Sequence, residues 1–326
     1  MKVIKPSVIA DVNLYSSTVS ELSNPEDYYT FGGSLVAPLQ WLDSYATSGA
    51  PSYALGARVW RAATHRIYEV LDPAGIPAGR TVKPENDIDG VTTSPKWLQV
   101  GPTNKWAMFD GEIASATKDG AAITVVLNTS QINSVALFGL VGSSVTVTLR
   151  DSTNTTVLYT ATKNLEGVFV DNWYDYFFSE FRQIDLAVFT DLPVYYAAKL
   201  TIEVTGTNVQ IGQAVVGYAY FIGETEYGSS SGIIDYSKKE ANTFGNVTFI
   251  TRAFSKRMSA KLWLQNTSLD YIQSKLAEVR ATPCVWVGTE DTTYNNLVVY
   301  GFYKDFTLEV TYPTTSSCSL EIEGLI

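Results

Sequence analysis

The stretch WLQVGPTNKWAMFDG, Trp97–Gly111, joins two parts of this chain and decides how the rest is divided. Gly101-Pro102 at its centre is a turn signal. Large apolar residues flank this turn on both sides: Trp97, Leu98, Val100, Trp106, Met108 and Phe109. Apolar residues so close to a turn predict two elements packed against each other, so we interpret the stretch as a rigid joint. Working outward from it gives a mainly β, multidomain chain.

Composition limits the classes of function. The 326 residues favour two to three domains, and 45% hydrophobic residues are enough for sizeable cores. Only 17% of residues are charged and the net charge is −10. Nucleic-acid backbones are bound by clustered Lys and Arg, so we expect no nucleic-acid partner. No apolar run reaches the length of a membrane span.

Before the joint, residues 46–103 predict a small β module. The runs YALGARVWR (53–61) and THRIYEVL (64–71) predict a hairpin turning at 62–64, and Trp97 returns an aromatic side chain to the core. The pattern consists of Tyr53, Gly56, Val59, Tyr68, a loop proline at Pro84 and the closing Trp97. It resembles the small chitin-binding type of carbohydrate-binding module, although Ala57 replaces that family's acidic residue. The resemblance implies the fold of such a module.

After the joint, residues 104–226 predict an antiparallel β-sandwich. Alternating apolar runs of strand length recur at 123–127, 135–140, 145–149, 157–160, 200–204, 209–211 and 215–222. Turn residues separate these runs, as in sandwiches and jelly rolls. The order of Asp110-Gly111, VLN and LFGLVGSSVTVTLRD resembles the galactose-binding-like jelly roll. That fold occurs in carbohydrate-binding modules and in purely structural proteins, so it implies no single function.

Within the sandwich, residues 165–198 are rich in aromatic side chains. We expect a glycan-binding or protein-binding surface formed by Trp173, Tyr174, Tyr176, Tyr195 and Tyr196. Tyr and Trp suit both kinds of surface because they bury much area at a low entropy cost. The alternative is that about half of the aromatics of this region pack under the sandwich edge. Interleaved carboxylates, Asp171, Asp175 and Glu180, are the candidates for a two-carboxylate glycosidase, which is the least favoured function.

The last region, residues 227–326, predicts an α+β domain with one helix. Leu269, Ile272, Leu276 and Val279 lie on one face of a helix from Leu269 to Arg280, which Pro283 ends. Basic residues gather in one segment of this acidic chain: Lys238, Lys239, Arg252, Lys256 and Arg257. They are either a solvated strand face or a docking surface for an acidic neighbour.

The C-terminal sequence resembles known viral proteins. The segments are IDYSKKEANTFGNVTFITRAFSKRMSAKLWL, LAEVRATPCVWVGT, VVYGFYKDFTLEVTYP and CSLEIEGL, with GPTNKWAMFDG at the joint. They are similar to the C-terminal region and joint of tail baseplate or tail-tip proteins of tailed bacteriophages. The resemblance implies a virion component made in the host cytoplasm. It also implies that other tail proteins and further copies, as a trimer or hexamer ring, are its partners.

Residues 1–45 predict an extended N-terminal arm. Val3, Ile4, Val8, Ile9 and Val12 are too apolar for a free tail. Either their own chain or a neighbouring copy covers them, and we expect the neighbour. The start MKVIKPSVIA has Pro6 and no apolar core, so we expect no secretory signal.

Catalytic and cofactor motifs do not appear in the sequence. His65, the only histidine, lies at the predicted hairpin turn, where a structural hydrogen bond is expected. Cys284 and Cys318 lack the spacing of a zinc site and are expected to be buried thiols. We therefore expect a structural protein without enzymatic activity, cofactor or metal; the alternative is a glycan-binding host-recognition module.

Overall fold

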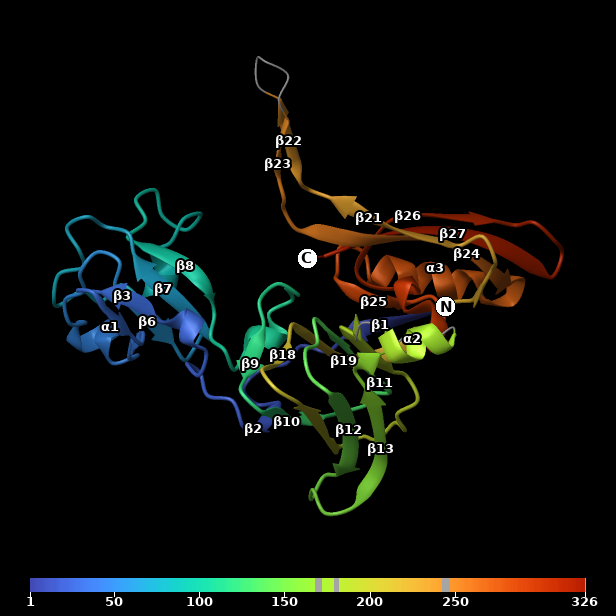
Figure 1. Cartoon of the computed structure of the whole chain (residues 1–326), viewed down its shortest axis with the longest axis horizontal. Helices are drawn as coiled ribbons and strands as arrows, with labels where there is room; N and C mark the ends of the chain where they lie inside the picture. The colour runs from blue at the N-terminus through green and yellow to red at the C-terminus, as the bar shows by residue number, and fades with distance from the viewer. Residues whose placement is uncertain (168–171, 179–181, 242–246, 326) are drawn as a thin grey trace.

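The computed structural model describes residues 1–167, 172–178, 182–241 and 247–325. The chain is mainly β, as predicted, and forms a small module connected to a larger body (Figure 1). Two sheets build the body, one of ten strands and one of five. Short 3-10 helices lie at Pro25–Asp27, Pro84–Asn86, Ala107–Phe109, Asn266–Ser268 and Thr292–Leu297.

The ten-stranded sheet is antiparallel and runs through the whole body. Its order is β16 (Leu186–Phe189), β11 (Ser134–Phe138), β19 (Gln213–Phe221), β1 (Lys2–Pro6), β25 (Cys284–Val287), β26 (Val298–Glu309), β27 (Thr315–Gly324), β24 (Phe254–Gln265) and β20 (Glu224–Thr225). β21 (Ser230–Asp235) pairs with the other part of β24. The sandwich strands β16, β11 and β19 thus continue into the C-terminal strands through β1.

The second sheet completes the predicted β-sandwich. It consists of β13 (Val157–Asn164), β12 (Ser144–Asp151), β17 (Ala198–Thr205), β10 (Ala122–Thr129) and β2 (Leu14–Ser17). Every second residue of β12 and β17 is buried, which is the pattern of a sheet with one face on a core. The core between the sheets contains Val147, Leu200 and Ile202 from this sheet and Leu137 and Val216 from the other. All seven predicted strands of the sandwich are present.

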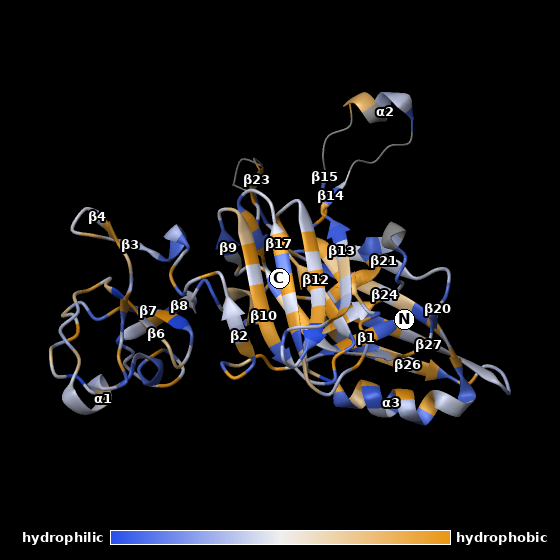
Figure 2. Cartoon of the chain, turned by 90° about the horizontal axis from the view of Figure 1, so that it is seen from below, coloured by the Kyte–Doolittle hydropathy of each residue, from blue (hydrophilic) through white to orange (hydrophobic). Residues whose placement is uncertain are grey.

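Three short ribbons complete the body. β9 (Thr117–Asp119) pairs with β18 (Val209–Ile211). β14 (Glu166–Gly167) pairs with β15 (Arg182–Gln183) to form a stalk, and α2 (Trp173–Phe178) lies between these two strands in the sequence. β22 (Lys238–Ala241) pairs with β23 (Val247–Ile250). The stalk with α2 and the β22–β23 hairpin both project from the body (Figures 1 and 2).

The single predicted helix of the C-terminal region is α3, Leu269–Glu278. Ile272 and Leu276 are buried against the sheet residues Leu262, Cys284 and Leu320. The helix ends at Glu278 with Val279 as its C-cap, two residues before Ala281 adopts a φ of 54°, so it is slightly shorter than predicted. The α+β character of this region is confirmed.

The small module has a four-stranded sheet, β5 (Leu39–Gln40), β6 (Arg58–Arg61), β7 (Arg66–Val70) and β8 (Trp97–Pro102), together with the β3 (Tyr29–Phe31) and β4 (Ser34–Val36) hairpin and α1 (Tyr45–Ser48). The predicted hairpin is β6–β7. Trp41, Tyr53, Tyr68 and Trp97 form its aromatic core. Trp41 shows that part of the predicted arm belongs to this module.

A buried arginine in the small module was not predicted. The Arg61 side chain is 1% exposed and lies over the Trp41 ring, 4.9 Å from its centroid. Its guanidinium donates two hydrogen bonds to Glu85, of 2.8 and 3.1 Å, and contacts Asp43 at 2.9 Å. A buried charge needs such pairing, so Arg61 fixes the loop of residues 72–95 to the hairpin.

The joint differs in detail from its prediction. Gly101-Pro102 is no turn: it ends β8, where the register with β7 shifts by a bulge. The chain changes direction afterwards, in the 3-10 helix Ala107–Phe109. Trp97 lies in the core of the small module and Met108 in that of the sandwich, whereas Leu98 and Val100 are exposed. The two sides of the stretch therefore serve two cores.

Trp106 holds the joint together. Its indole nitrogen donates to Glu21, and its ring stacks on His65 with centroids 4.0 Å apart. Glu21 also accepts a 2.6 Å hydrogen bond from the Thr103 hydroxyl. Glu21, from before the small module, and His65, from its β6–β7 turn, thus meet at the Trp106 indole.

The arm expected to reach a neighbour packs on its own chain instead. Val3 and Ile4 are 1% and 0% exposed because β1 pairs with β19 on one side and β25 on the other. β2 then pairs with β10. Val8 and Val12, between the two strands, are exposed. The expectation failed because an apolar strand can fill a gap within a sheet as well as cover a neighbouring copy.

We predict that Ile4→Ala lowers the free energy of unfolding of the body by about 2–5 kcal/mol, since it leaves a cavity at a fully buried site in the middle of the sheet. Denaturant titration measures the change. Val8→Ala is the matched control, at a side chain 88% exposed, and should change stability by less than about 0.5 kcal/mol. Equal effects of the two substitutions would contradict the central place of β1.

Candidate functional site

The predicted aromatic surface is only partly assembled. Trp173, Tyr174, Phe177 and Phe178 project from α2 with 67–80% of each residue exposed. The rings of Trp173 and Phe177 stack 6.5 Å apart, and those of Tyr174 and Phe178 lie 4.8 Å apart. The side chains of Tyr176 and Asp175, and residues Asp171 and Glu180, lie outside the described residues.

Tyr195 and Tyr196 belong to a different surface. They precede Ala198 at the start of β17, and the Tyr195 carbonyl accepts from the Gln131 amide. The stalk of α2 instead follows Asn164, which lies beside Ser144, the partner of Thr205 at the far end of β17. Eight residues of strand at about 3.3 Å each place these ends roughly 23 Å apart. The prediction placed them on the same surface as the α2 aromatics because only one short strand, β16, lies between the two segments in the sequence.

The predicted basic segment is divided as well. Lys238 and Lys239 lie on the projecting hairpin, Arg252 lies at its base, and Lys256 and Arg257 lie on β24. Neighbouring residues of a strand point to opposite faces, so Lys256 and Arg257 do not share one surface. Lys256 lines a small cavity beside Tyr300, whereas Arg257 lies over Gly232.

The β22–β23 hairpin carries two of these cations, Lys238 and Lys239. Lys239 lies 6.0 Å from the centroid of the Phe249 ring and has no carboxylate partner within the described part of the chain. Lys238 pairs with Glu240 at 2.6 Å. Phe249 is 70% exposed, and Val247 and Ile250 are exposed beside it. The hairpin thus combines exposed apolar side chains with cations.

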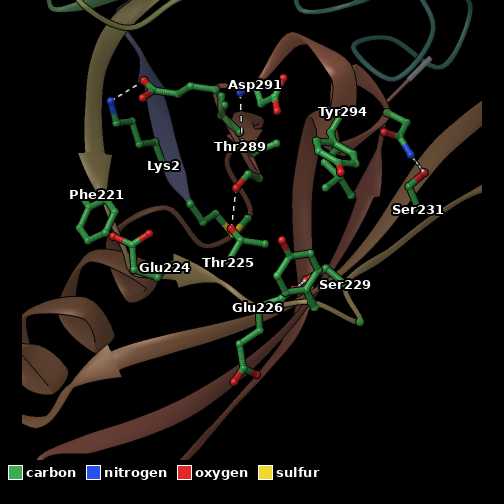
Figure 3. Close-up of a pocket in the computed structure, with 18 residues that line it drawn as sticks. Lys2, Phe221, Glu224, Thr225, Glu226, Ser229, Ser231, Thr289, Asp291 and Tyr294 are labelled. Carbon is green, nitrogen blue, oxygen red and sulfur yellow. Dashed lines mark hydrogen bonds and ion pairs between the residues drawn. The ribbon is translucent and has the colours of Figure 1, made fainter.

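Sequence reasoning missed a cavity of about 690 Å³ at the strand ends of the large sheet, where β1 begins and β19 and β25 end. We name it the edge cavity. Its walls are the start of β1, the turn between β20 and β21, and the segment 287–297 that follows β25. Figure 3 shows Lys2 and Glu224 on one side of it and Tyr294 on the other. Residues from three distant parts of the sequence form it, so no local motif could reveal it.

The edge cavity is acidic. Glu224, Glu226, Glu290 and Asp291 line it, together with the aromatic rings of Phe221, Tyr227 and Tyr294. Lys2, the one lysine in its wall, is paired with Glu290 at 2.5 Å, and the amino group of Met1 donates to the Gly223 carbonyl. The hydrogen bond from Lys2, and then that from Thr190, lowers the pKa of Glu290, so this carboxylate stays charged. Such a lining suits a positively charged or hydroxyl-rich group.

His65 occupies the turn of the β6–β7 hairpin, as predicted, with a φ of 54°. Its Nε2 lies 3.3 Å from the Asp11 carboxylate and its ring covers Trp106. Both contacts hold the joint, so the structure gives His65 a structural place.

Cys284 and Cys318 are both free and buried in the core beside α3. Burial raises the pKa of the Cys284 thiol to about 12 and that of Cys318 to about 11, so neither forms a thiolate near neutral pH. Across the described ranges, no cluster of three or more His, Cys, Asp or Glu is arranged to hold a metal ion. No described helix is long and apolar enough to cross a membrane.

Comparison with known proteins adds no relative: no protein-family model matches the chain, and no curated protein matches it.

One carboxylate beside the joint is held in an unfavourable position. Burial, and then repulsion from Glu26, raises the pKa of Asp27 to about 7. Arg58 is near but donates to Glu69 at 2.8 Å, and the Asp27 Oδ2 has no hydrogen-bond partner within the described residues. The folded chain therefore favours the protonated form of Asp27.

We predict that Asp27 makes the small module less stable as pH rises. Its pKa is higher in the folded chain than its usual 3.8, so its contribution is most favourable below about pH 4 and is lost as pH rises through about 7. Asp27→Asn, which cannot ionise, should be more stable than the natural chain at pH 8 and equally stable at pH 4. Thermal unfolding at both pH values measures this.

Asp151→Asn is the control of opposite sign. Hydrogen bonds, first from Thr153, lower the pKa of Asp151 to about 2, so its substitution should reduce stability at pH 8. An Asp27→Asn chain that is less stable at pH 8 would contradict the assignment.

Proposed function

We propose that this chain is a structural, non-enzymatic component of a bacteriophage tail baseplate or tail tip, located in the virion. It assembles with other tail proteins and with its own copies. The sequence resemblance of the C-terminal region and joint motivates the proposal. The structural observation that supports it is the pair of projecting elements, the β22–β23 hairpin and α2.

Neither projecting element has enough structure of its own to be stable in isolation. A two-stranded hairpin is at best marginally stable in water, and a helix of six residues is far shorter than the roughly 12 residues that isolated helices need. Both carry large exposed apolar side chains, such as Phe249 and Trp173. Elements of this kind gain stability when another surface covers them, and a virus tail provides such surfaces.

We predict that replacing residues 238–250 by a short glycine-containing turn leaves the body folded and prevents incorporation into virions. The hairpin projects from Asp235 and Phe254, which are paired with each other, so a turn can close there. Circular dichroism checks the fold, and mass spectrometry of purified particles checks incorporation. Shortening the exposed loop at 152–155 is the matched control: it removes the hydrogen bonds from Thr153 and Thr155 to Asp151 and so lowers stability, but it should leave incorporation into virions unchanged.

Two results would reject the proposal. Normal particles without the hairpin would remove its structural basis. Turnover of a bacterial surface polysaccharide by the purified chain would show that it is an enzyme.

The second candidate, a glycan-binding host-recognition module, is favoured by one observation: the exposed aromatic rings of α2. In that case Trp173→Ala and Tyr174→Ala should each abolish binding on a glycan array. Tyr196→Ala, at a ring 82% exposed on the far end of the sheet, is the control and should bind normally. Absence of specific binding by the natural chain would reject this candidate.

A further inference from the structure

The β22–β23 hairpin and the edge cavity lie at opposite ends of strand β21. Ser231, in β21, lines the cavity, and the hairpin begins at Lys238. Seven residues of extended chain at about 3.3 Å each span roughly 23 Å. In Figure 1 the hairpin points away from the body, so it does not reach the cavity of its own chain.

The two surfaces are complementary in charge. Lys239 and Arg252 carry positive charge at the hairpin, and neither has an ion-pair partner in the described residues. Glu224 and Glu226 carry negative charge in the cavity wall; Glu226 has no ion-pair partner in the described residues, and Glu224 lies near the Met1 amino group, whose pKa burial lowers and Glu224 raises. Opposite charges at two separate places attract each other between copies and set the orientation of the contact.

The two surfaces are also complementary in polarity. Phe249, Val247 and Ile250 are exposed on the hairpin, and Phe221, Tyr227 and Tyr294 expose their rings at the cavity. Tyr227 is fully exposed, and Phe221 is 54% exposed. Burying these side chains against each other removes apolar surface from water on both copies.

We propose that the edge cavity receives the β22–β23 hairpin of a second copy of this chain. This inference rests on the self-assembly part of the proposed function and names the surface that self-assembly uses. The hairpin strands supply Lys239 and Phe249, and the cavity supplies Glu224 and Tyr227. Because donor and acceptor are different surfaces of each copy, the contact is head-to-tail and repeats until the rotation closes a ring.

A charge exchange tests the contact. Lys239→Glu and Glu224→Lys, each alone, should place like charges together and weaken self-association at least tenfold, or about 1.4 kcal/mol. The chain carrying both substitutions should regain association. Sedimentation velocity at low and high salt measures the dissociation constant, and salt should weaken the natural contact. Lys304→Glu, at an exposed lysine of β26 outside the cavity, is the matched control and should leave association unchanged.

Disulfide trapping tests the geometry. A mixture of Phe249→Cys chains and Tyr227→Cys chains should form a mixed disulfide under mild oxidation. Mixing Phe249→Cys with Tyr196→Cys, at a residue that is also highly exposed (82%), should not. Cys284 and Cys318 do not interfere because both are buried.

Each outcome decides between alternatives. A monomeric chain, or association that Glu224→Lys leaves intact, overturns the proposal, and the latter result would leave the cavity to a soluble ligand such as a glycan. A mixed disulfide in a protein that is absent from virions supports the contact and rejects the tail function. Presence in virions without the mixed disulfide rejects the contact and keeps the function.

Discussion

The pairing of β1 with β19 and β25 is the interaction on which the body depends. Without β1 the sandwich would end at the edge of β19 and the C-terminal sheet at the edge of β25, each with a row of unpaired backbone groups. Val3 turns to the core under α3 and Ile4 to the opposite face beside Val285. This five-residue strand therefore pairs with the backbone groups of two sheet edges and contributes side chains to two cores.

This continuous sheet gives the projecting elements a rigid base. The hairpin leaves from β21 and β24, which are part of the sheet, and the stalk of α2 leads directly into β16 at its other edge. The edge cavity lies beside β1 itself. The strands from which these surfaces leave are thus joined by one ladder of hydrogen bonds.

The sequence was sufficient where structure is local. Alternating apolar and polar residues predicted the strands of the sandwich, and the spacing of apolar residues predicted α3, because both patterns follow from backbone geometry. It was insufficient where distant residues meet. Three features depend on which strands become neighbours: the burial of Val3 and Ile4, the separation of α2 from Tyr195 and Tyr196 at opposite ends of β17, and the edge cavity. Arg61 was missed because its partners, Asp43 and Glu85, lie about 20 residues away on either side.

The position of β1 also affects how this chain folds while it is being synthesised. Ile4 pairs with Ala219 and Val285, so the strand leaves the ribosome long before β19 exists and longer still before β25 does. At about 5–20 residues per second, that delay is on the order of 15–60 seconds. For most of this time β1 has neither partner strand, and once β19 has been made the two strands still lack β25. A pairing of such sequence separation slows folding, and the waiting strand is a natural target for chaperones or for aggregation.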